Sequence, residues 1–279
     1  MEAGRYGWRM LKKLRSLVRR FGGPYVSPAN SHALALFDSD VFLVSYPKSG
    51  NTWVRFLLAR YISGGKVDLS LTNQLIPDIG YNPQDITGSL NPRIIKTHRP
   101  FTEQYKRVIY IVRDGRDVAV SYFHHLKKFR KIEASVRFSD YLDIFIEGKV
   151  GSFGQWGGNV NGWLDGAKDM LLIRYEDLLA DTPRVLGSIV RYCALDFNEQ
   201  KIIESVSACS LAELREIEAR QFNEIKGFST SDPAMYFFRK GVSGDWKNFF
   251  NENDERQFMA AFAGVMSRVG YGCMKREGN

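Results

Sequence analysis

Residues 41–61, VFLVSYPKSGNTWVRFLLARY, decide the fold of this chain of 279 residues. The first five, 41–45, form a short apolar and β-branched run, which predicts a buried parallel strand. Residues 46–51 form a turn that contains one cation, Lys48. In residues 52–61 the apolar side chains recur at helical spacing, so a helix should follow the turn.

A strand, a glycine-containing turn and a helix in this order form a site for an anion. The backbone N–H groups and the positive dipole end at the start of the helix face one point. Lys48 would add a point charge, and Ser49, Asn51 and Thr52 would add donors. The lysine precedes Gly50 and no second glycine lies upstream, unlike the GxxxxGK[ST] loop for nucleoside triphosphates. We therefore expect a different anionic ligand; an ordinary turn with an exposed lysine is the alternative.

The length and the hydrophobic content of 44% suit one α/β domain with a large core. The formal charge is +8, but residues 1–20 hold seven Arg or Lys against one Glu, a net of +6 that leaves only +2 for the rest. The basic excess is thus mostly a property of the N-terminal arm. We expect no nucleic-acid partner for the domain.

Neither a disulfide framework nor a metal site is predicted. The cysteines are odd in number, lack CxxC spacing, and suit reduced structural thiols: Cys193, Cys209 and Cys273. No cluster of His, Cys or paired carboxylates has metal-ligand spacing. No apolar run reaches the roughly 20 residues of a membrane span. Four cations between residues 12 and 19 interrupt the only apolar stretch that resembles a secretory signal. We therefore expect a cytoplasmic enzyme.

The N-terminal arm, residues 1–39, is predicted to be separate from the domain at 40–279. Within it, residues 8–21 alternate apolar side chains and cations at helical spacing, which predicts a basic amphipathic helix. The helix could contact an anionic membrane surface or pack on the domain by its apolar stripe, and the sequence favours neither. Residues 22–39 form a connector.

Residues 93–100, RIIKTHRP, place a histidine at the end of a second strand. Ile94 and Ile95 end the strand, and Lys96, Thr97 and His98 follow at its carboxyl end, where open α/β sheets bind ligands. An imidazole accepts a proton well at neutral pH, so His98 is a candidate general base. A hydrogen-bonded structural histidine is the alternative.

Residues 107–126 repeat the strand-turn-helix order, with a strand at 108–112, a turn at 113–117 and a helix from 118. Two such units predict a single α/β domain in which helices flank a central parallel sheet. Arg113 in the turn suits a phosphate, because its planar fork can donate two parallel bonds. The alternative is a surface ion pair with Asp114 or Asp117.

The other segments carry weaker predictions. Residues 63–92 should be irregular with one short helix, and residues 148–158 a mobile glycine-rich loop over the site. A strand is expected at 170–174 and helices at 139–146, from 159, at 182–195 and at 199–208. The clustered cations of residues 127–137 are more typical of a solvated face than of a binding patch: Lys127, Lys128, Arg130, Lys131 and Arg137.

Five segments, in order, resemble the motifs of cytosolic-type sulfotransferases that use 3′-phosphoadenosine 5′-phosphosulfate (PAPS). YPKSGNTW at 46–53 is similar to the P-loop-like 5′-phosphosulfate loop, and KTH at 96–98 to the catalytic segment. RDGRDVAVS at 113–121 is similar to the 3′-phosphate motif, and RYEDL at 174–178 to a signature whose tyrosine reaches the adenine. RKGVSGDWK at 239–247 closely resembles the RKGxxGDWK segment.

The resemblance implies a role for each matching residue. His98 would deprotonate the acceptor, Lys48 would neutralise the leaving phosphate oxygen, and Lys96 would assist. Trp53 and Tyr175 would contact the adenine. The remaining cofactor-binding residues are Ser49, Gly50, Asn51 and Thr52 at the phosphosulfate, and Arg113, Ser121, Phe237, Phe238, Arg239, Lys240 and Gly241 at the 3′-phosphate.

The resemblance also implies PAPS as donor, 3′-phosphoadenosine 5′-phosphate (PAP) as product, in-line transfer and no metal. The acceptor would offer a hydroxyl or an amine on a small molecule, a lipid or a carbohydrate. Leu211 follows Ser210 where the family often has an aromatic residue, and Asn251-Glu252 occupy the Thr-Val positions of its dimer signature. The oligomeric state therefore stays open.

Two alternatives from other classes stay open at this point. A P-loop-type nucleotide kinase would share the sheet and the first loop, but it would bind ATP with Mg²⁺ and ignore a 3′-phosphate. A non-catalytic membrane-surface module would use the helix at 8–21 as its working part.

Overall fold

Four parallel strands form the centre of the computed structural model, which describes residues 35–80, 91–221, 231–232 and 234–272. Their order in the sheet is β2-β1-β3-β4. The strands are β1 (Val41–Ser45), β2 (Ile94–Thr97), β3 (Arg107–Val112) and β4 (Asp169–Arg174). The predicted parallel sheet is confirmed, and β1 has the predicted bounds. The sequence prediction placed Lys96 and Thr97 after β2, but both belong to the strand.

Alternate residues of each strand face two separate cores, because successive side chains point to opposite faces of a sheet. In β1, Phe42 and Val44 pack into one core, whereas Val41 and Leu43 pack into the other. All four side chains are fully buried or nearly so. This explains why the strand is a continuous apolar run without polar alternation.

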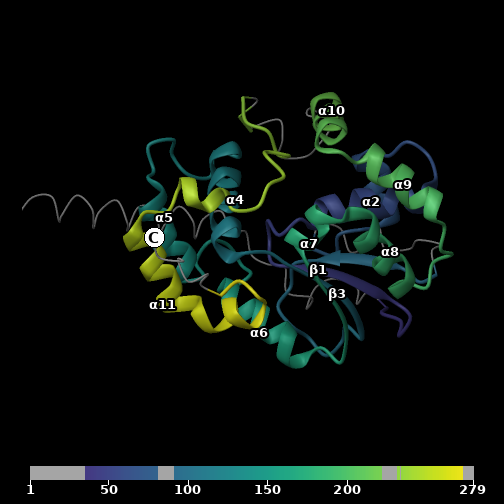
Figure 1. Cartoon of the computed structure of the whole chain (residues 1–279), viewed down its shortest axis with the longest axis horizontal. Helices are drawn as coiled ribbons and strands as arrows, with labels where there is room; N and C mark the ends of the chain where they lie inside the picture. Colours follow the sequence, from purple (N-terminus) through teal and green to yellow (C-terminus); the bar gives the residue numbers. More distant parts are fainter. Residues whose placement is uncertain (1–34, 81–90, 222–230, 233, 273–279) are drawn as a thin grey trace, which may run out of the picture.

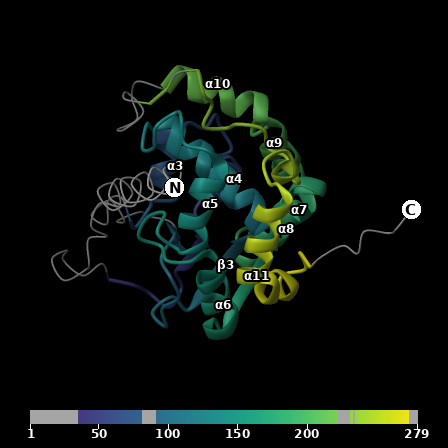
Figure 2. The same cartoon turned by 90° about the vertical axis from the view of Figure 1, so that its left-hand side faces the viewer.

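Helices cover both faces of the sheet and give three layers (Figure 1). On one face lie α4 (Gly115–Lys128), α5 (Phe138–Ile146), α6 (Trp156–Gly166) and α11 (Glu252–Arg268). On the other lie α2 (Asn51–Ser63), α7 (Tyr175–Ala180), α8 (Thr182–Tyr192), α9 (Glu199–Ala208) and α10 (Leu211–Gln221). Both views place α10 at the upper margin, away from the sheet (Figure 1, Figure 2). The short helices α3 (Leu69–Leu75) and η3 (Asp245–Asn248) complete the described elements.

Some predicted bounds were wrong. The helix α4 begins at Gly115 rather than at 118, because the Asp114 carboxylate accepts the Arg116 N–H and caps it. The glycine-rich loop ends before Trp156, which begins α6. No helix was predicted after residue 250, although Asn251 and Asp254 form a capping box there.

The prediction of a solvated cationic face at residues 127–137 was wrong for one residue. Arg137 is exposed, as a residue of a solvated face should be, and it pairs with Asp140. Lys128, however, is only 2% exposed, and its ammonium lies 3.1 Å from a carboxylate oxygen of Glu218 on α10. A buried lysine needs such a partner, since an unpaired charge is costly away from water.

Several predictions concern residues outside the described ranges, among them the amphipathic helix at 8–21 and Cys273. The other two cysteines, Cys193 and Cys209, are buried free thiols, and burial raises the pKa of each to about 12. Among the helices of the described ranges, none combines the length and apolar character needed to cross a membrane.

Candidate active site

A cleft of about 1320 Å³ opens where β1 meets the turns that follow it. The neighbours of β1 are β2 on one side and β3 on the other, so the chain leaves β1 at a point where strand order changes direction. Open α/β sheets bind ligands at such points. The cleft is lined by the turn after β1, α4, α7, α10 and a segment that we call the strap, residues 234–242.

The turn after β1 has the backbone geometry of an anion site. Lys48 has φ +73° and Gly50 has φ +100°, in the left-handed region. At Gly50 a Cβ atom would lie 2.5 Å from Cδ2 of Tyr175, so both the φ value and the contact require glycine. Gly50 caps α2 without a side-chain bond. The first-turn N–H groups of α2 are therefore left for a ligand.

The side chains of this turn differ in what they face. Lys48, Asn51 and Thr52 line the cleft together with Gly50. The Asn51 amide is engaged by β1, because it donates to the Leu43 carbonyl at 3.2 Å. Ser49 does not line the cleft: its side chain is buried, and its hydroxyl has no hydrogen-bond partner among the described residues. The structure therefore does not bring the predicted Ser49 donor to the cleft.

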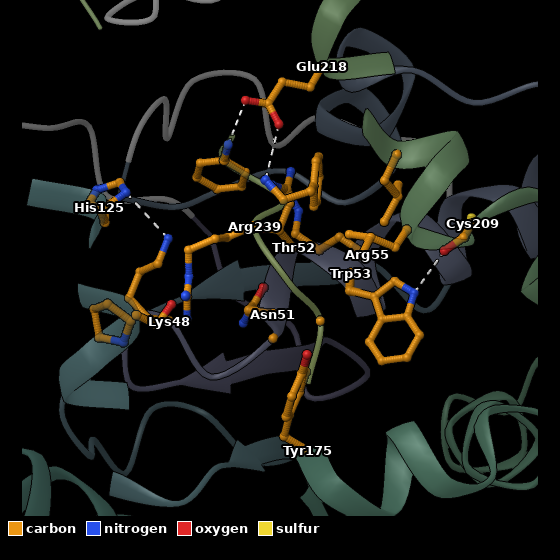
Figure 3. Close-up of a pocket in the computed structure, with 18 of the residues that line it drawn as sticks. Lys48, Asn51, Thr52, Trp53, Arg55, His125, Tyr175, Cys209, Glu218 and Arg239 are labelled. Atoms are coloured by element: carbon orange, nitrogen blue, oxygen red, sulfur yellow. Dashed lines mark hydrogen bonds between the residues drawn. The ribbon is translucent and has the colours of Figure 1, made fainter. Parts of the chain in front are cut away.

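Lys48 is held among cations and aromatic rings. Its Nζ lies 3.3 Å from Nδ1 of His125 and 4.4 Å from the centre of the Phe237 ring (Figure 3). Burial, and then Arg113 and Arg239, lower the pKa of Lys48 to about 7. An anion in the cleft would relieve this repulsion, so the site has unsatisfied positive potential.

His98 follows β2 and faces the cleft with one nitrogen fixed. Its Nδ1–H donates to the Ser45 carbonyl at 2.7 Å, so in the neutral ring Nε2 is the proton acceptor. Burial, and then Lys96, lower its pKa to about 3. Lys96 also lines the cleft, but its ammonium lies 2.5 Å from a carboxylate oxygen of Asp78. The carboxylate of Asp78 therefore competes with any ligand for Lys96.

Arg113 and Ser121 both line the cleft, although about two helical turns separate them along the chain. Arg113 donates to the Val242 carbonyl of the strap at 2.9 Å, and its guanidinium carbon lies 4.3 Å from the Tyr175 ring centre. Its side chain is buried, and its Nε has no hydrogen-bond partner among the described residues. Arg113 does pair with Asp117, at 3.8 Å between Nη2 and a carboxylate oxygen, but the pair is buried and not on the surface as the alternative proposed.

Two aromatic rings form one wall of the cleft. Trp53 and Tyr175 meet edge to face with 6.1 Å between ring centres. The indole N–H of Trp53 donates to the Cys209 carbonyl at 3.0 Å, which fixes the ring plane (Figure 3). Leu211, which stands where an aromatic residue was expected, also lines the cleft. A planar base can therefore contact Trp53 and Tyr175 without a third ring.

The strap closes the cleft opposite the turn after β1. Its residues 237–242 all line the cleft, including Arg239, Lys240 and Gly241. Arg239 and Lys240 both pair with Asp245, at 2.6 and 2.7 Å. Burial alone would raise the pKa of this carboxylate, but hydrogen bonds, the largest from Lys240, lower it to about 2. One carboxylate thus holds two cations at the cleft.

The residues that line the cleft without having been predicted include Asp78, His125, Phe153 and Glu218. His125 had a usable signal, since it lies four residues after Ser121 and so shares its helix face. The Phe153 ring meets the His98 ring edge to face at 5.7 Å. Phe153 belongs to the glycine-rich loop, so this loop contributes to the wall of the cleft. The loop is held by the Tyr46 hydroxyl, which donates to the Gly154 carbonyl.

Within the described ranges, no group of three or more His, Cys, Asp or Glu side chains is placed to hold a metal ion. The cleft instead gathers cationic side chains from three separate parts of the sequence: Lys48, Arg113 and Arg239. This donor set suits an anion with two charged ends, such as a nucleotide phosphorylated at two positions.

Comparisons with known proteins agree with this geometry. A family model described as a sulfotransferase domain matches residues 38–270. Sulfotransferase 1B1 of Canis lupus familiaris is 25% identical over 280 residues, which cover 92% of this chain and 94% of that protein. Amine sulfotransferase of Oryctolagus cuniculus is 29% identical over 244 residues, 81% of this chain and 80% of that protein.

Solved structures give the same result. A mouse sulfotransferase, SULT7A1, complexed with PAP is 28% identical, with a TM-score of 0.67 over 85% of this chain and 87% of that one. A retinol dehydratase in complex with androsterone and inactive cofactor PAP has a TM-score of 0.68 over 91% of this chain and 88% of that one. At 20% identity, this second likeness shows the fold alone.

Proposed function

The chain belongs to the sulfotransferase family, and on that premise we propose which residues carry the reaction and what they do. It is a PAPS-dependent enzyme, with PAP as the product nucleotide. Family membership sets the nucleotide-kinase alternative aside. We propose that residues 40–279 form the catalytic domain, as the family match from residue 38 suggests, and that residues 1–39 form an arm.

One observation carries the proposal: Lys48, Arg113 and Arg239 line a single cleft with His98. In our proposal Lys48 and the first-turn N–H groups of α2 hold the 5′-phosphosulfate. Arg113, Ser121, Arg239, Lys240 and Gly241 hold the 3′-phosphate. The adenine lies against Trp53 and Tyr175, and Phe237 and Phe238 flank the nucleotide.

His98 acts as the general base in this proposal. Its Nε2 takes the proton from the acceptor's hydroxyl or amine, while its Nδ1–H stays bonded to the Ser45 carbonyl. As the acceptor oxygen or nitrogen forms its bond to sulfur, the bond between sulfur and the 5′-phosphate oxygen breaks. The electron pair stays on that oxygen. This order of bond changes balances protons and charge without a further reactant.

Lys48 neutralises the oxygen that leaves. Its Nζ is bonded to His125 and lies near Phe237, so it needs only to exchange the His125 nitrogen for the phosphate oxygen. A preorganised donor of this kind lowers a barrier by about 3 to 4 kcal/mol. Lys96 assists from its position beside Asp78, with which its ammonium is paired in the free protein.

For the acceptor we propose a hydroxyl or amine compound of small-molecule, lipid or carbohydrate type. The groups around His98 are mixed: the Phe153 ring offers an apolar wall, and His125 and Asp78 offer polar atoms. A panel of phenols, alcohols, amines, sugars and lipids with sulfur-labelled PAPS tests the proposal. We expect labelled product with at least one class, and the same panel with the Lys48→Ala variant supplies the background. Hydrolysis of PAPS without transfer to any class would contradict the proposed acceptor chemistry.

A further inference from the structure

Side chains of helix α10 bind the backbone of the strap. The Glu218 carboxylate accepts the Phe237 N–H at 2.6 Å with one oxygen and the Phe238 N–H at 3.1 Å with the other (Figure 3). Glu218 is only 4% exposed. A buried carboxylate that accepts two backbone donors is strongly bound, because charge-assisted hydrogen bonds are about twice as strong as neutral ones.

A second side chain of the same helix completes this binding. Arg215 lies three residues before Glu218, on the same face of α10. Its Nε donates to the Phe238 carbonyl at 3.0 Å, and its Nη2 donates to the Arg239 carbonyl. Two side chains of α10 therefore hold both the donors and the acceptors of the backbone at 237–239.

Helix α4 holds the strap from the other side. The Lys128 ammonium lies 3.1 Å from Glu218 and donates to the Met235 carbonyl. The Lys128 carbonyl accepts the Asp232 N–H at 2.7 Å. The Lys128 ammonium thus balances the charge of Glu218 and also fixes the start of the strap at Met235.

The strap connects the two ends of the cleft. Phe237 places its ring 4.4 Å from the Nζ of Lys48, at the end where the sulfuryl group would be transferred. Arg239 pairs with Asp245, and the Val242 carbonyl accepts from Arg113, at the proposed 3′-phosphate end. A shift of the backbone at 237–239 would displace the charged Arg239 at the 3′-phosphate end, whereas at the other end it would move only the uncharged Phe237 ring.

We propose that Glu218 is a positioning residue that sets the preference of the site for a 3′-phosphorylated nucleotide, by fixing the strap backbone between α10 and Lys128. The inference rests on the proposed function, since it assumes that Arg239 binds the 3′-phosphate. Glu218 acts through Phe237, Phe238 and Arg239 rather than on the ligand itself.

Glu218→Gln is the test substitution, because the amide has the shape of the carboxylate but only one acceptor oxygen. Its NH₂ group would face a backbone N–H or the Lys128 ammonium, so one donor would lose its partner. We expect the variant to bind PAP about tenfold more weakly, the usual loss for a charge-assisted bond. Binding of adenosine 5′-monophosphate, which lacks the 3′-phosphate, should change less than about threefold. Calorimetric titration measures both.

Glu216→Gln is the matched control, since Glu216 is exposed on the same helix. It should leave both affinities unchanged. Equal weakening of PAP and adenosine 5′-monophosphate by Glu218→Gln would show a merely structural role and overturn the inference. A wild-type protein that does not prefer PAP would instead overturn the proposed function, so the two failures are distinguishable.

Two measurements decide the matter if Glu218→Gln does not fold. In the wild-type protein, the Phe237 and Phe238 amides should exchange hydrogen as slowly as the interior of α10; fast exchange would show that the strap is not fixed. Arg215→Met removes the second contact at a partly exposed position and should shift the ratio of the two affinities in the same direction. An unchanged ratio would contradict the role of α10.

Discussion

Lys48 lies where burial and two arginines oppose its charge, so its contribution should be large once an anion is present. We expect Lys48→Ala to lower the turnover number by about 10² to 10³-fold, as the removal of one preorganised donor does at comparable sites. Steady-state transfer from labelled PAPS measures the effect. Near-normal turnover would reject the proposed role at the leaving oxygen.

Proton uptake on binding follows from the same residue. The pKa of Lys48 is about 7 in the free protein, and a bound phosphate would raise it. Above about pH 7 the free lysine is partly neutral, so binding takes up a proton and the affinity for PAP falls as pH rises. Titration calorimetry at about pH 8 in two buffers of different ionisation enthalpy measures the uptake. The Lys48→Met variant lacks the ammonium, so the part of the proton uptake that is due to Lys48 should disappear. Release of protons on PAP binding by the wild-type protein would contradict the prediction.

His98 should affect chemistry and not nucleotide binding. Its Nδ1–H is committed to the Ser45 carbonyl, so the acceptor meets Nε2 alone. We expect His98→Ala to lower turnover by about 10² to 10⁴-fold while PAP binds with unchanged affinity. His124→Ala is the control, since His124 does not line the cleft. If His98→Ala turned over at a near-normal rate, the base would be elsewhere.

At the scale of the element, the turn between β1 and α2 depends on Gly50. Gly50→Ala would place a Cβ 2.5 Å from the Tyr175 ring at φ +100°. We expect a loss of about 1 to 3 kcal/mol of stability and markedly weaker PAP binding, measured by thermal unfolding and by titration. Gly65→Ala is the control, because nothing lies within 4 Å of a Cβ at that exposed position. Equal effects of the two substitutions would mean that the turn tolerates a side chain.

Elements with local signals were predictable from the sequence. The apolar run of β1 and the glycine turn after it specify their own structure, and β1 has the predicted bounds. The α4 helix was predicted three residues short, because the capping role of Asp114 depends on backbone angles. The helix at 252–268 had both a capping box and apolar spacing, so its absence from the predictions was avoidable.

Residues whose role depends on distant partners were not predictable. Lys128 is one of a run of cations, and only the fold brings Glu218, ninety residues further along the chain, to its ammonium. Ser49 shows the converse, as its motif predicts a donor but the turn directs its side chain into the interior. The resemblance pointed to residues that line the cleft, Ser49 excepted, whereas the distances that decide their partners came from the structure.

At the scale of the molecule, the sheet brings together turns that are far apart in the sequence. Lys48 follows β1, Arg113 follows β3, and Arg239 lies on the strap beside α10. Since β1 and β3 are parallel neighbours, their carboxyl ends lie side by side and the two cations share one cleft. The strap then supplies the third cation. The central claim is that these three groups bind one nucleotide at both of its charged ends.

Titration of the wild-type protein and of Arg239→Ala with PAP and with ADP tests that claim most directly. PAP and ADP carry the same base and the same number of phosphates, but only PAP has one at the 3′ position. We predict that the wild-type protein binds PAP at least about tenfold more tightly, and that Arg239→Ala removes most of the difference by weakening PAP alone. Equal affinity of the wild-type protein for the two nucleotides, or equal weakening of both by the substitution, would contradict the account.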